Sequence, residues 1–242
     1  MDYCLYNGDC LEVLPKLNPV NCIFADPPDG IGLKYDHFDD KLAGDEYVKH
    51  LRRWMELFLD RADIVWVSFN ATWTFEMGRI VCDLLDANKH LEAKPCVQTF
   101  TFGQHSHADL GNNHRPLYRL LHKNTAVLYP DAIRVPSWRQ ENGDKRADPR
   151  GRVPGDVFDF TRVTGNSKQR RKWHPTQLNE GLVERCVKFS TLEGQTVLDP
   201  FGGTGTTLRV CKRINRLCTL VELSPGYCTH IAAENSLEIL RV

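Results

Sequence analysis

The chain has 242 residues, of which 41% are hydrophobic and 26% charged, and its formal net charge is zero. These values are typical of a soluble globular protein with one large domain or two small ones, and they exclude a low-complexity or disordered chain. Charge is unevenly distributed, because residues 1–70 carry 7 Lys/Arg and 13 Asp/Glu whereas residues 103–174 carry 14 and 7. The basic segment is either a phosphate-binding face or a solvated, loop-rich insertion.

The nine cysteines are scattered and form no Cys-x-x-Cys pair, which argues against a zinc site. Buried free thiols in a reducing compartment explain them best. The sequence has no secretory signal pattern and no apolar run of 18 or more residues. We therefore expect a soluble, cytoplasmic protein with no membrane partner and no bound metal.

Short apolar runs alternate along the chain with segments of helical periodicity. The strand-like runs are 3–6, 22–25, 64–69, 97–102, 126–129, 196–198 and 218–221, and the helical segments are 45–59, 176–190 and 206–214. Several strand-like runs are apolar at every position, which is typical of parallel strands covered on both faces. The pattern predicts an α/β fold: a three-layer sandwich around a mainly parallel, seven-stranded, Rossmann-like sheet.

Residues from about 131 to 173 break this rhythm. They show little periodicity and end in the most basic run of the chain, which reads Lys-Gln-Arg-Arg-Lys-Trp from position 168. Loops of this length are uncommon inside compact domains and are often functional. We predict one domain over residues 1–242 with this basic insertion, whose Arg170, Arg171 and Lys172 would lie against a phosphate backbone.

An acidic turn follows the apolar run 22–25 and reads Asp26, Pro27, Pro28, Asp29. In open α/β sheets, ligands bind outside the carboxyl ends of the strands. The two prolines remove backbone donors, so the turn offers acceptors: the Asp26 carboxylate and the carbonyls of Asp26 and Pro27. Such acceptors suit a substrate amine, for example that of adenine or cytosine, whose lone pair they would aim at a methyl donor.

A glycine loop follows the apolar run 196–198, and a helical segment starts at Thr206. The glycines are Gly202, Gly203 and Gly205. They permit close approach of a ligand, and Glu222, 17 residues after Gly205, is placed to bind ribose hydroxyls. The third glycine of the dinucleotide fingerprint is missing, and Asp199 would repel a pyrophosphate. The loop therefore predicts the cationic cofactor S-adenosylmethionine (SAM) rather than NAD.

Together these motifs resemble those of the DNA adenine-N6 and cytosine-N4 amino-methyltransferases, in the circularly permuted β group. The similarity extends to residues 6–11, 174–177, 198–207 and 221–227, whereas about 70–170 match only loosely. The resemblance implies an enzyme, often part of a restriction–modification system, that transfers methyl from SAM to the exocyclic amine of a base flipped out of duplex DNA. Adenine-N6 is favoured over cytosine-N4 because it is commoner in the family.

The resemblance also implies roles for single residues. The catalytic turn would be Asp26, Pro27, Pro28 and Asp29. The cofactor would contact Asp9, Thr176, Gln177, Asp199, Phe201, Gly202, Gly203, Gly205, Thr206 and Glu222. DNA would contact Tyr35, Arg170, Arg171 and Lys172. Thr176 and Gln177 are expected at a helix start, where the helix N-terminus would favour the cofactor carboxylate.

Two places depart from the family pattern. The turn usually ends in an aromatic residue that stacks on the flipped base for roughly 1–3 kcal/mol, and here it ends in Asp29. Either Tyr35 or Phe38 replaces it, or Asp29 bonds another edge of the base, or catalysis is lost. Leu178 and Asn179 stand where lysine and proline are common.

Three functions follow: a DNA enzyme, the same chemistry on RNA, or a catalytically disabled partner protein that binds cofactor and nucleic acid. The basic segment is short for an independent recognition domain, so a homodimer is one way to complete DNA recognition.

Overall fold

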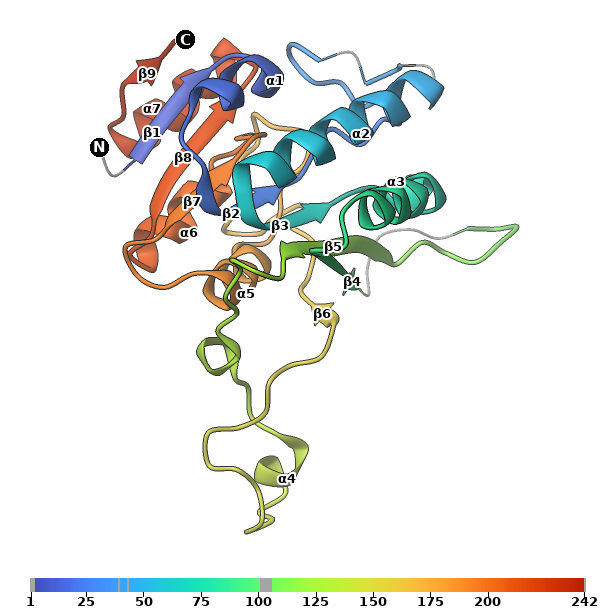
Figure 1. Cartoon of the computed structure of the whole chain (residues 1–242), viewed down its shortest axis with the longest axis vertical. Coiled ribbons are helices and arrows are strands. Elements are labelled where there is room, and N and C mark those ends of the chain that lie inside the picture. The colour runs from blue at the N-terminus through green and yellow to red at the C-terminus, as the bar shows by residue number, and fades with distance from the viewer. Residues whose placement is uncertain (1–2, 39, 43, 101–105, 242) are drawn as a thin grey trace.

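The structure, a computed structural model, describes residues 3–38, 40–42, 44–100 and 106–241. Its centre is a nine-stranded sheet in the order β6-β4-β5-β3-β2-β7-β8-β1-β9 (Figure 1). The strands are β1 (Tyr3–Asn7), β2 (Val20–Ala25), β3 (Ala62–Ser68), β4 (Leu91–Thr99), β5 (His114–His122), β6 (Val157–Asp159), β7 (Thr196–Asp199), β8 (Leu217–Glu222) and β9 (Ile239–Leu240). Strand β5 runs antiparallel to β3 and β4, and the other pairs of these strands are parallel.

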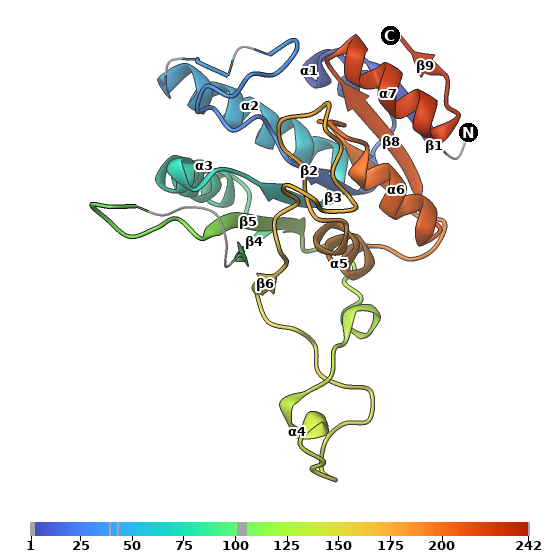
Figure 2. The same cartoon turned by 180° about the vertical axis from the view of Figure 1, so that it is seen from behind.

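Helices cover both faces of this sheet, which confirms the predicted three-layer α/β sandwich (Figures 1 and 2). One face carries α1 (Cys10–Val13), α2 (Gly44–Arg61) and α3 (Thr74–Ala87), and the other carries α5 (Glu180–Ser190), α6 (Thr206–Arg213) and α7 (Pro225–Asn235). The short elements are η1 (Leu14–Lys16), η2 (Ala71–Trp73), η3 (Pro130–Ile133) and α4 (Trp138–Glu141). No helix within the described ranges is long and apolar enough to cross a lipid bilayer.

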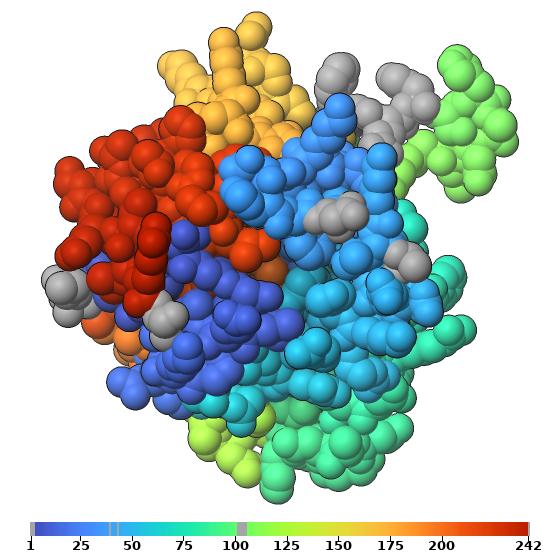
Figure 3. Space-filling view, turned by 90° about the horizontal axis from the view of Figure 1, so that it is seen from above, coloured from blue at the N-terminus to red at the C-terminus, as the bar shows by residue number. Residues whose placement is uncertain are grey.

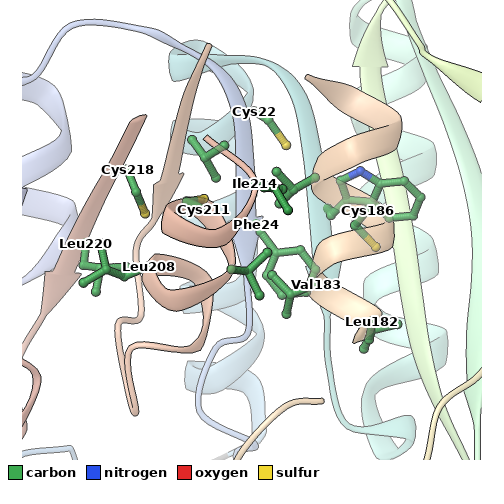
Figure 4. Close-up of a cluster of buried hydrophobic side chains, with 14 of the residues drawn as sticks. Cys22, Phe24, Leu182, Val183, Cys186, Leu208, Cys211, Ile214, Cys218 and Leu220 are labelled. Atoms are coloured by element: carbon green, nitrogen blue, oxygen red, sulfur yellow. The ribbon is translucent and has the colours of Figure 1, made fainter. Parts of the chain in front are cut away.

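The apolar strands lack alternation because each face of the sheet has its own core. In β2, Cys22 and Phe24 pack toward α5 and α6, whereas Ile23 and Ala25 pack toward α2. Figure 4 shows the first of these cores, where the thiols of four buried cysteines lie among Val, Leu and Ile side chains; they are Cys22, Cys186, Cys211 and Cys218. These thiols are free, as expected of cysteines that fill space in a core.

The strand predicted at 126–129 is wrong. Those residues are irregular, and Ala126 and Leu128 pack against the core from outside the sheet. The true neighbour of β3 is β5, which the sequence concealed because Arg115, Pro116 and Arg119 interrupt its apolar pattern. The sheet has nine strands rather than seven, since β6 and β9 have only three and two residues, too few to show a period.

The helix predicted from residue 176 begins four residues later. Asn179 is its N-cap: it has extended dihedral angles (φ −74°, ψ 128°) and its side chain accepts a hydrogen bond from the Gly181 N–H at 2.8 Å. Thr176 and Gln177 therefore lie in the preceding loop, and the expectation that they stand at a helix start is wrong.

The predicted insertion at 131–173 is divided by β6 into two parts. Because β5 is antiparallel to β3, the chain leaves it at the amino-terminal edge of the parallel strands, where residues 130–156 form an extended arm (Figure 1). Strand β6 is parallel to β4 and returns the chain to the carboxyl edge. The second part, residues 160–173, therefore lies at the edge where the acidic turn and the glycine loop are found.

Candidate active site

The carboxyl ends of β1, β2, β7 and β8 open into one pocket of about 560 Å³, a volume common for small-ligand sites. Figure 3 looks onto this edge, where the loop after β2 (light blue) and residues 160–178 (yellow-orange) lie side by side. Most predicted site residues line the pocket: Asp9, Asp26, Pro27, Pro28, Asp29, Tyr35, Arg170, Thr176, Gln177, Asp199, Phe201, Gly202, Gly203, Thr206 and Glu222. Three predicted residues do not line it: Arg171, Lys172 and Gly205.

Asp199 is the last residue of β7 and is only 6% exposed. One carboxylate oxygen accepts a hydrogen bond from the Phe201 N–H at 2.9 Å, and the other accepts one from the Thr207 hydroxyl at 2.6 Å. Burial raises the pKa of Asp199 to about 8, although both hydrogen bonds act to lower it. A carboxyl group in this state is stabilised as an anion by a cation that enters the pocket.

Glu222 ends β8 and connects two loops of the pocket. Its oxygens accept hydrogen bonds from the Gly203 N–H at 2.7 Å and the Ser224 N–H at 2.8 Å. Burial raises the pKa of Glu222 to about 7 against these backbone bonds. Each carboxylate oxygen keeps a further lone pair, so the group can still accept a hydrogen bond from a ligand hydroxyl.

The glycine loop between these two acids disfavours side chains, by close contact at Gly202 and by a positive φ at Gly203. A Cβ on Gly202 would lie 3.3 Å from the Cβ of Glu222 and 3.4 Å from the Val221 carbonyl oxygen. Gly203 has a φ of +50°, and a Cβ there would lie 3.5 Å from Nε2 of His174. The loop therefore presents bare backbone to the pocket.

The acidic turn Asp26–Asp29 contains a feature that the sequence did not reveal. The Arg115 guanidinium of β5 donates to Asp26 at 2.7 Å and to Asp29 at 2.8 Å. Its Nε donates to the Ser68 hydroxyl at 2.7 Å. Burial raises the pKa of Asp26, Arg115 opposes that rise, and Asp29 adds to it. The turn thus combines two carboxylates with one shared cation.

The backbone of the turn is held from the α2–α3 face. The Tyr47 hydroxyl donates to the Pro28 carbonyl, and the indole N–H of Trp73 donates to the Asp29 carbonyl at 2.8 Å. The next residues form a loop around Asp40, whose carboxylate accepts three backbone N–H groups, from Gly30, Ile31 and Leu33. The Asp26–Asp29 turn is therefore anchored on both sides.

A family model of DNA methylases (N6_N4_Mtase) matches residues 20–234. The chain belongs to this family. The type II methyltransferase M.HpaI of Haemophilus parainfluenzae is 28% identical over 94% of this chain and 72% of its own length. M.BglII of Bacillus subtilis is 27% identical over 92% of this chain and 66% of its own length. The DNA adenine methyltransferase YhdJ of Escherichia coli K12 is 26% identical over 92% of this chain and 79% of its own length.

Solved structures of DNA methyltransferases share the fold. The cytosine-N4-specific PvuII DNA methyltransferase has a TM-score of 0.74 at 16% identity and covers 96% of this chain and 87% of its own. A complex of M1.HpyAVI with SAM has a TM-score of 0.62 at 18% identity and covers 96% and 99%. The fold and the family expected from the motifs are confirmed.

SAM is the cofactor of this methylase family, and the pocket fits it. A sulfonium and an ammonium cation suit a site where Asp199 and Glu222 are buried acids with raised pKa values. The bare backbone at Gly202 and Gly203 gives a nucleoside room to approach. Both properties follow from side chains and backbone in the pocket itself.

Two other predicted cofactor residues, Asp9 and Gln177, make hydrogen bonds to the protein itself. Asp9 caps α1 by accepting from the Leu11 N–H at 2.8 Å. The Gln177 side chain accepts from the Arg171 N–H at 2.8 Å and donates to the Gln169 carbonyl at 2.6 Å. Gln177 therefore orders the loop before α5, and its direct contact with a cofactor remains a prediction.

Tyr35 and Phe38, the two aromatic residues that could stack on the base in place of the family's aromatic residue, differ in position. Tyr35 lines the pocket with its ring 5.9 Å from the His174 ring. Phe38 also lines the pocket and packs on Trp54 at 6.4 Å in the core under α2. Tyr35 is the better placed of the two, because its ring lies between the turn and the loop before α5.

The predicted DNA-contacting cations are only partly available. Arg170 lines the pocket and donates to the Pro175 carbonyl at 3.1 Å. Arg171 is held by Glu234 of α7 at 2.9 Å, whereas Lys172 is exposed.

Proposed function

We propose that this methylase transfers a methyl group from SAM to the exocyclic amine of a base flipped out of DNA, adenine-N6 in preference to cytosine-N4. The observation that supports it most is that Asp26 and Asp199, at the ends of the adjacent strands β2 and β7, line a single pocket. Adenine is supported by YhdJ, which is named a DNA adenine methyltransferase and is 26% identical, whereas the cytosine-N4-specific PvuII enzyme shares the fold.

The cofactor would lie along the glycine loop. Asp199 would face its cationic methionine part, Glu222 its ribose and Asp9 its adenine, with Thr176 and Gln177 toward its carboxylate. When bound, SAM supplies an electrophilic methyl group on a sulfonium. Asp199 and Glu222 are themselves buried, so their charges would act on that positive charge with little screening by solvent.

The turn would bind the target base. Arg115 donates to Oδ1 of Asp26 and not to Oδ2, so we expect Oδ2, together with the Pro27 carbonyl, to accept an N–H from the target amine. These acceptors orient the nitrogen lone pair out of the ring plane and toward the methyl donor. The same carboxylate would accept the proton that the nitrogen releases after methylation.

The ion pairs of the turn support an active turn over a disabled one. Asp29 raised that possibility, but its carboxylate is paired with Arg115 and Asp26 remains in place. Asp29 therefore contributes an ion pair to the turn where the family has a stacking ring.

The proposal is tested by nucleoside mass spectrometry of unmethylated duplex DNA incubated with the protein and SAM. We expect N6-methyladenine with the wild-type protein and none with Asp26→Ala. N4-methylcytosine instead would support the chemistry and correct the base. No methylated base on duplex DNA, single-stranded DNA or RNA, despite measured SAM binding, would contradict the proposal.

A further inference from the structure

Asp26, Arg115 and Asp29 form a hydrogen-bonded triad across the turn and β5. We propose that Arg115 is a positioning residue that fixes the Asp26 carboxylate for the target amine, and that Asp29 orients Arg115 instead of stacking on the base. The role in catalysis rests on the proposed function, whereas the geometry of the triad does not.

Each nitrogen of the Arg115 guanidinium has a different partner. Nε binds the Ser68 hydroxyl, Nη1 binds Asp29 and Nη2 binds Asp26, all between 2.7 and 2.8 Å. A planar guanidinium held at three corners cannot rotate without breaking several of these bonds. The Arg115 side chain is 19% exposed, so the ion pairs are only weakly screened by solvent.

The triad is built on rigid elements. Asp26 follows the last residue of β2, Ser68 ends β3, and Arg115 is the second residue of β5. Strands β3 and β5 are directly paired, with Ser68 opposite Leu117. Residues mounted on paired strands hold a site more accurately than residues on free loops.

Asp29 is directed inward by its own backbone. Its carbonyl accepts the Trp73 indole N–H at 2.8 Å, and the N–H of the following Gly30 is held by Asp40. The Asp29 side chain is only 10% exposed. Its carboxylate is directed at Arg115 at 2.8 Å, so we expect its contribution to the site to pass through Arg115.

The charge balance around Asp26 explains why an arginine is needed. The groups that face Asp26 are Arg115 from β5, Asp29 in the same turn, Asp199 at the end of β7 and Tyr35 in the following loop. Arg115 supplies the cation of this group. Its positive charge lowers the pKa of Asp26 against the effect of burial and so favours the ionised form that accepts from an amine, and its hydrogen bond is made to Oδ1 rather than Oδ2.

One consequence separates this arrangement from a stacking turn. In a turn that binds the base by stacking, Asp29→Tyr would restore the family residue and would keep or raise activity. Here the substitution removes a partner of Arg115 and places a ring where the guanidinium lies. We expect Asp29→Tyr to lower kcat.

The experiment compares pH profiles of kcat for wild type, Arg115→Met, Arg115→Lys and Asp29→Asn. Arg119→Lys is the matched control, because Arg119 lies on the same strand, pairs with Glu92 at 2.8 Å and does not line the pocket. We expect Arg115→Met to lower kcat by about 100-fold, to shift the acid limb of the profile to higher pH and to leave the SAM Kd unchanged. Arg115→Lys should keep the acid limb of the profile at its wild-type pH but lower kcat, because lysine restores the charge without the planar guanidinium. Asp29→Asn should give a kcat between those of wild type and Arg115→Met.

A second readout does not depend on activity. The carboxyl carbon of Asp26, assigned by comparison with Asp26→Asn, is titrated by ¹³C NMR in the ligand-free protein. We expect its titration to move to higher pH in Arg115→Met and to stay in place in Arg119→Lys. An unmoved titration in Arg115→Met, or a loss of SAM affinity as large as the loss of kcat, would overturn the proposal. Absence of methylation by the wild-type protein would count against the proposed function and leave the titration as the test of the triad.

Discussion

Asp199 is a buried acid of the pocket whose two carboxylate oxygens both accept hydrogen bonds. Thr207 and the Phe201 backbone fix both of its oxygens, yet burial raises its pKa to about 8. The ordinary value is near 4, so the folded ligand-free protein binds this proton more tightly than the unfolded chain does. The stabilisation due to the bound proton is complete at low pH and is lost as pH rises from about 4 to about 8. Asp199 therefore destabilises the ligand-free fold at neutral pH in favour of a binding site.

Asp199→Asn should stabilise the ligand-free protein at pH 8.5 by an amount on the order of 2–5 kcal/mol, and by much less at pH 5. The amide oxygen can still accept from the Phe201 N–H, the amide N–H can donate to the Thr207 hydroxyl, and the neutral group has no charge to bury. Urea denaturation at the two pH values measures the difference, with Asp86→Asn as control because Asp86 is 84% exposed. Equal effects of Asp199→Asn at both pH values would contradict the account.

The affinity for SAM should also depend on this proton. A cation binds the ionised form of Asp199, so affinity should fall as pH drops from 7.5 to 6, by up to about tenfold per pH unit. The fall should be absent or much smaller in Asp199→Asn, which should bind SAM weakly throughout. Calorimetry with SAM measures both, and a pH-independent wild-type Kd would oppose a role for Asp199 in holding the cofactor.

Residues whose signal is local were predictable from the sequence. Asp26 and Asp199 each stand at the end of a short apolar run beside prolines or glycines, and the structure brings both into the pocket. Arg115 was not predictable, because its partner Asp26 lies 89 residues away and only the pairing of β3 with β5 brings them together. The one local sign was the unusual Asp29, a second carboxylate in the turn whose cationic partner the sequence did not identify.

At the scale of elements, the strands and helices that form the pocket were predicted well and their boundaries less so. The shift of the α5 start from 176 to Glu180 follows from Asn179, whose side chain offers the backbone a cap that periodicity does not show. The four residues before α5 are instead an ordered loop, since Gln177 bonds residues 169 and 171.

The cap at Asn179 gives a test at this scale. Asn179→Ala should lower the free energy of unfolding by about 1 kcal/mol relative to Asn179→Ser, since serine can still accept the Gly181 N–H. Both variants lose the bond from the amide to the Thr161 carbonyl, so their difference isolates the cap. Chemical denaturation measures it, and equal stability of the two variants would show that α5 does not depend on this cap.

At the scale of the whole molecule, the basic insertion consists of two parts, the arm before β6 and the segment after it, which differ in net charge. Residues 131–156 carry six Lys/Arg and five Asp/Glu, whereas residues 157–173 carry five Lys/Arg and one Asp/Glu. In the arm, Arg134, Arg146 and Arg150 are paired with acids of the arm itself. The excess positive charge therefore lies in the part that borders the pocket, and composition averaged over 131–173 could not show this division.

This division predicts where DNA phosphates are bound. The double variant Lys168→Ala/Lys172→Ala should weaken duplex binding and reduce the slope of log K against log salt by up to about 1.8, as for two lost phosphate contacts. The matched variant in the arm, Arg139→Ala/Lys145→Ala, removes the same charge and should change neither. Fluorescence anisotropy with duplex DNA at several salt concentrations measures both. A larger effect of the arm variant would place the DNA on the opposite edge of the sheet.

The central claim is that one pocket holds the methyl donor beside the catalytic turn. The most direct measurement is a crystal structure of the protein with S-adenosylhomocysteine. We predict density along Gly202 and Gly203, with the amino-acid part at Asp199, the ribose hydroxyls at Glu222 and the sulfur facing Asp26. A ligand bound elsewhere, or bound here with its sulfur directed away from Asp26, would contradict the account.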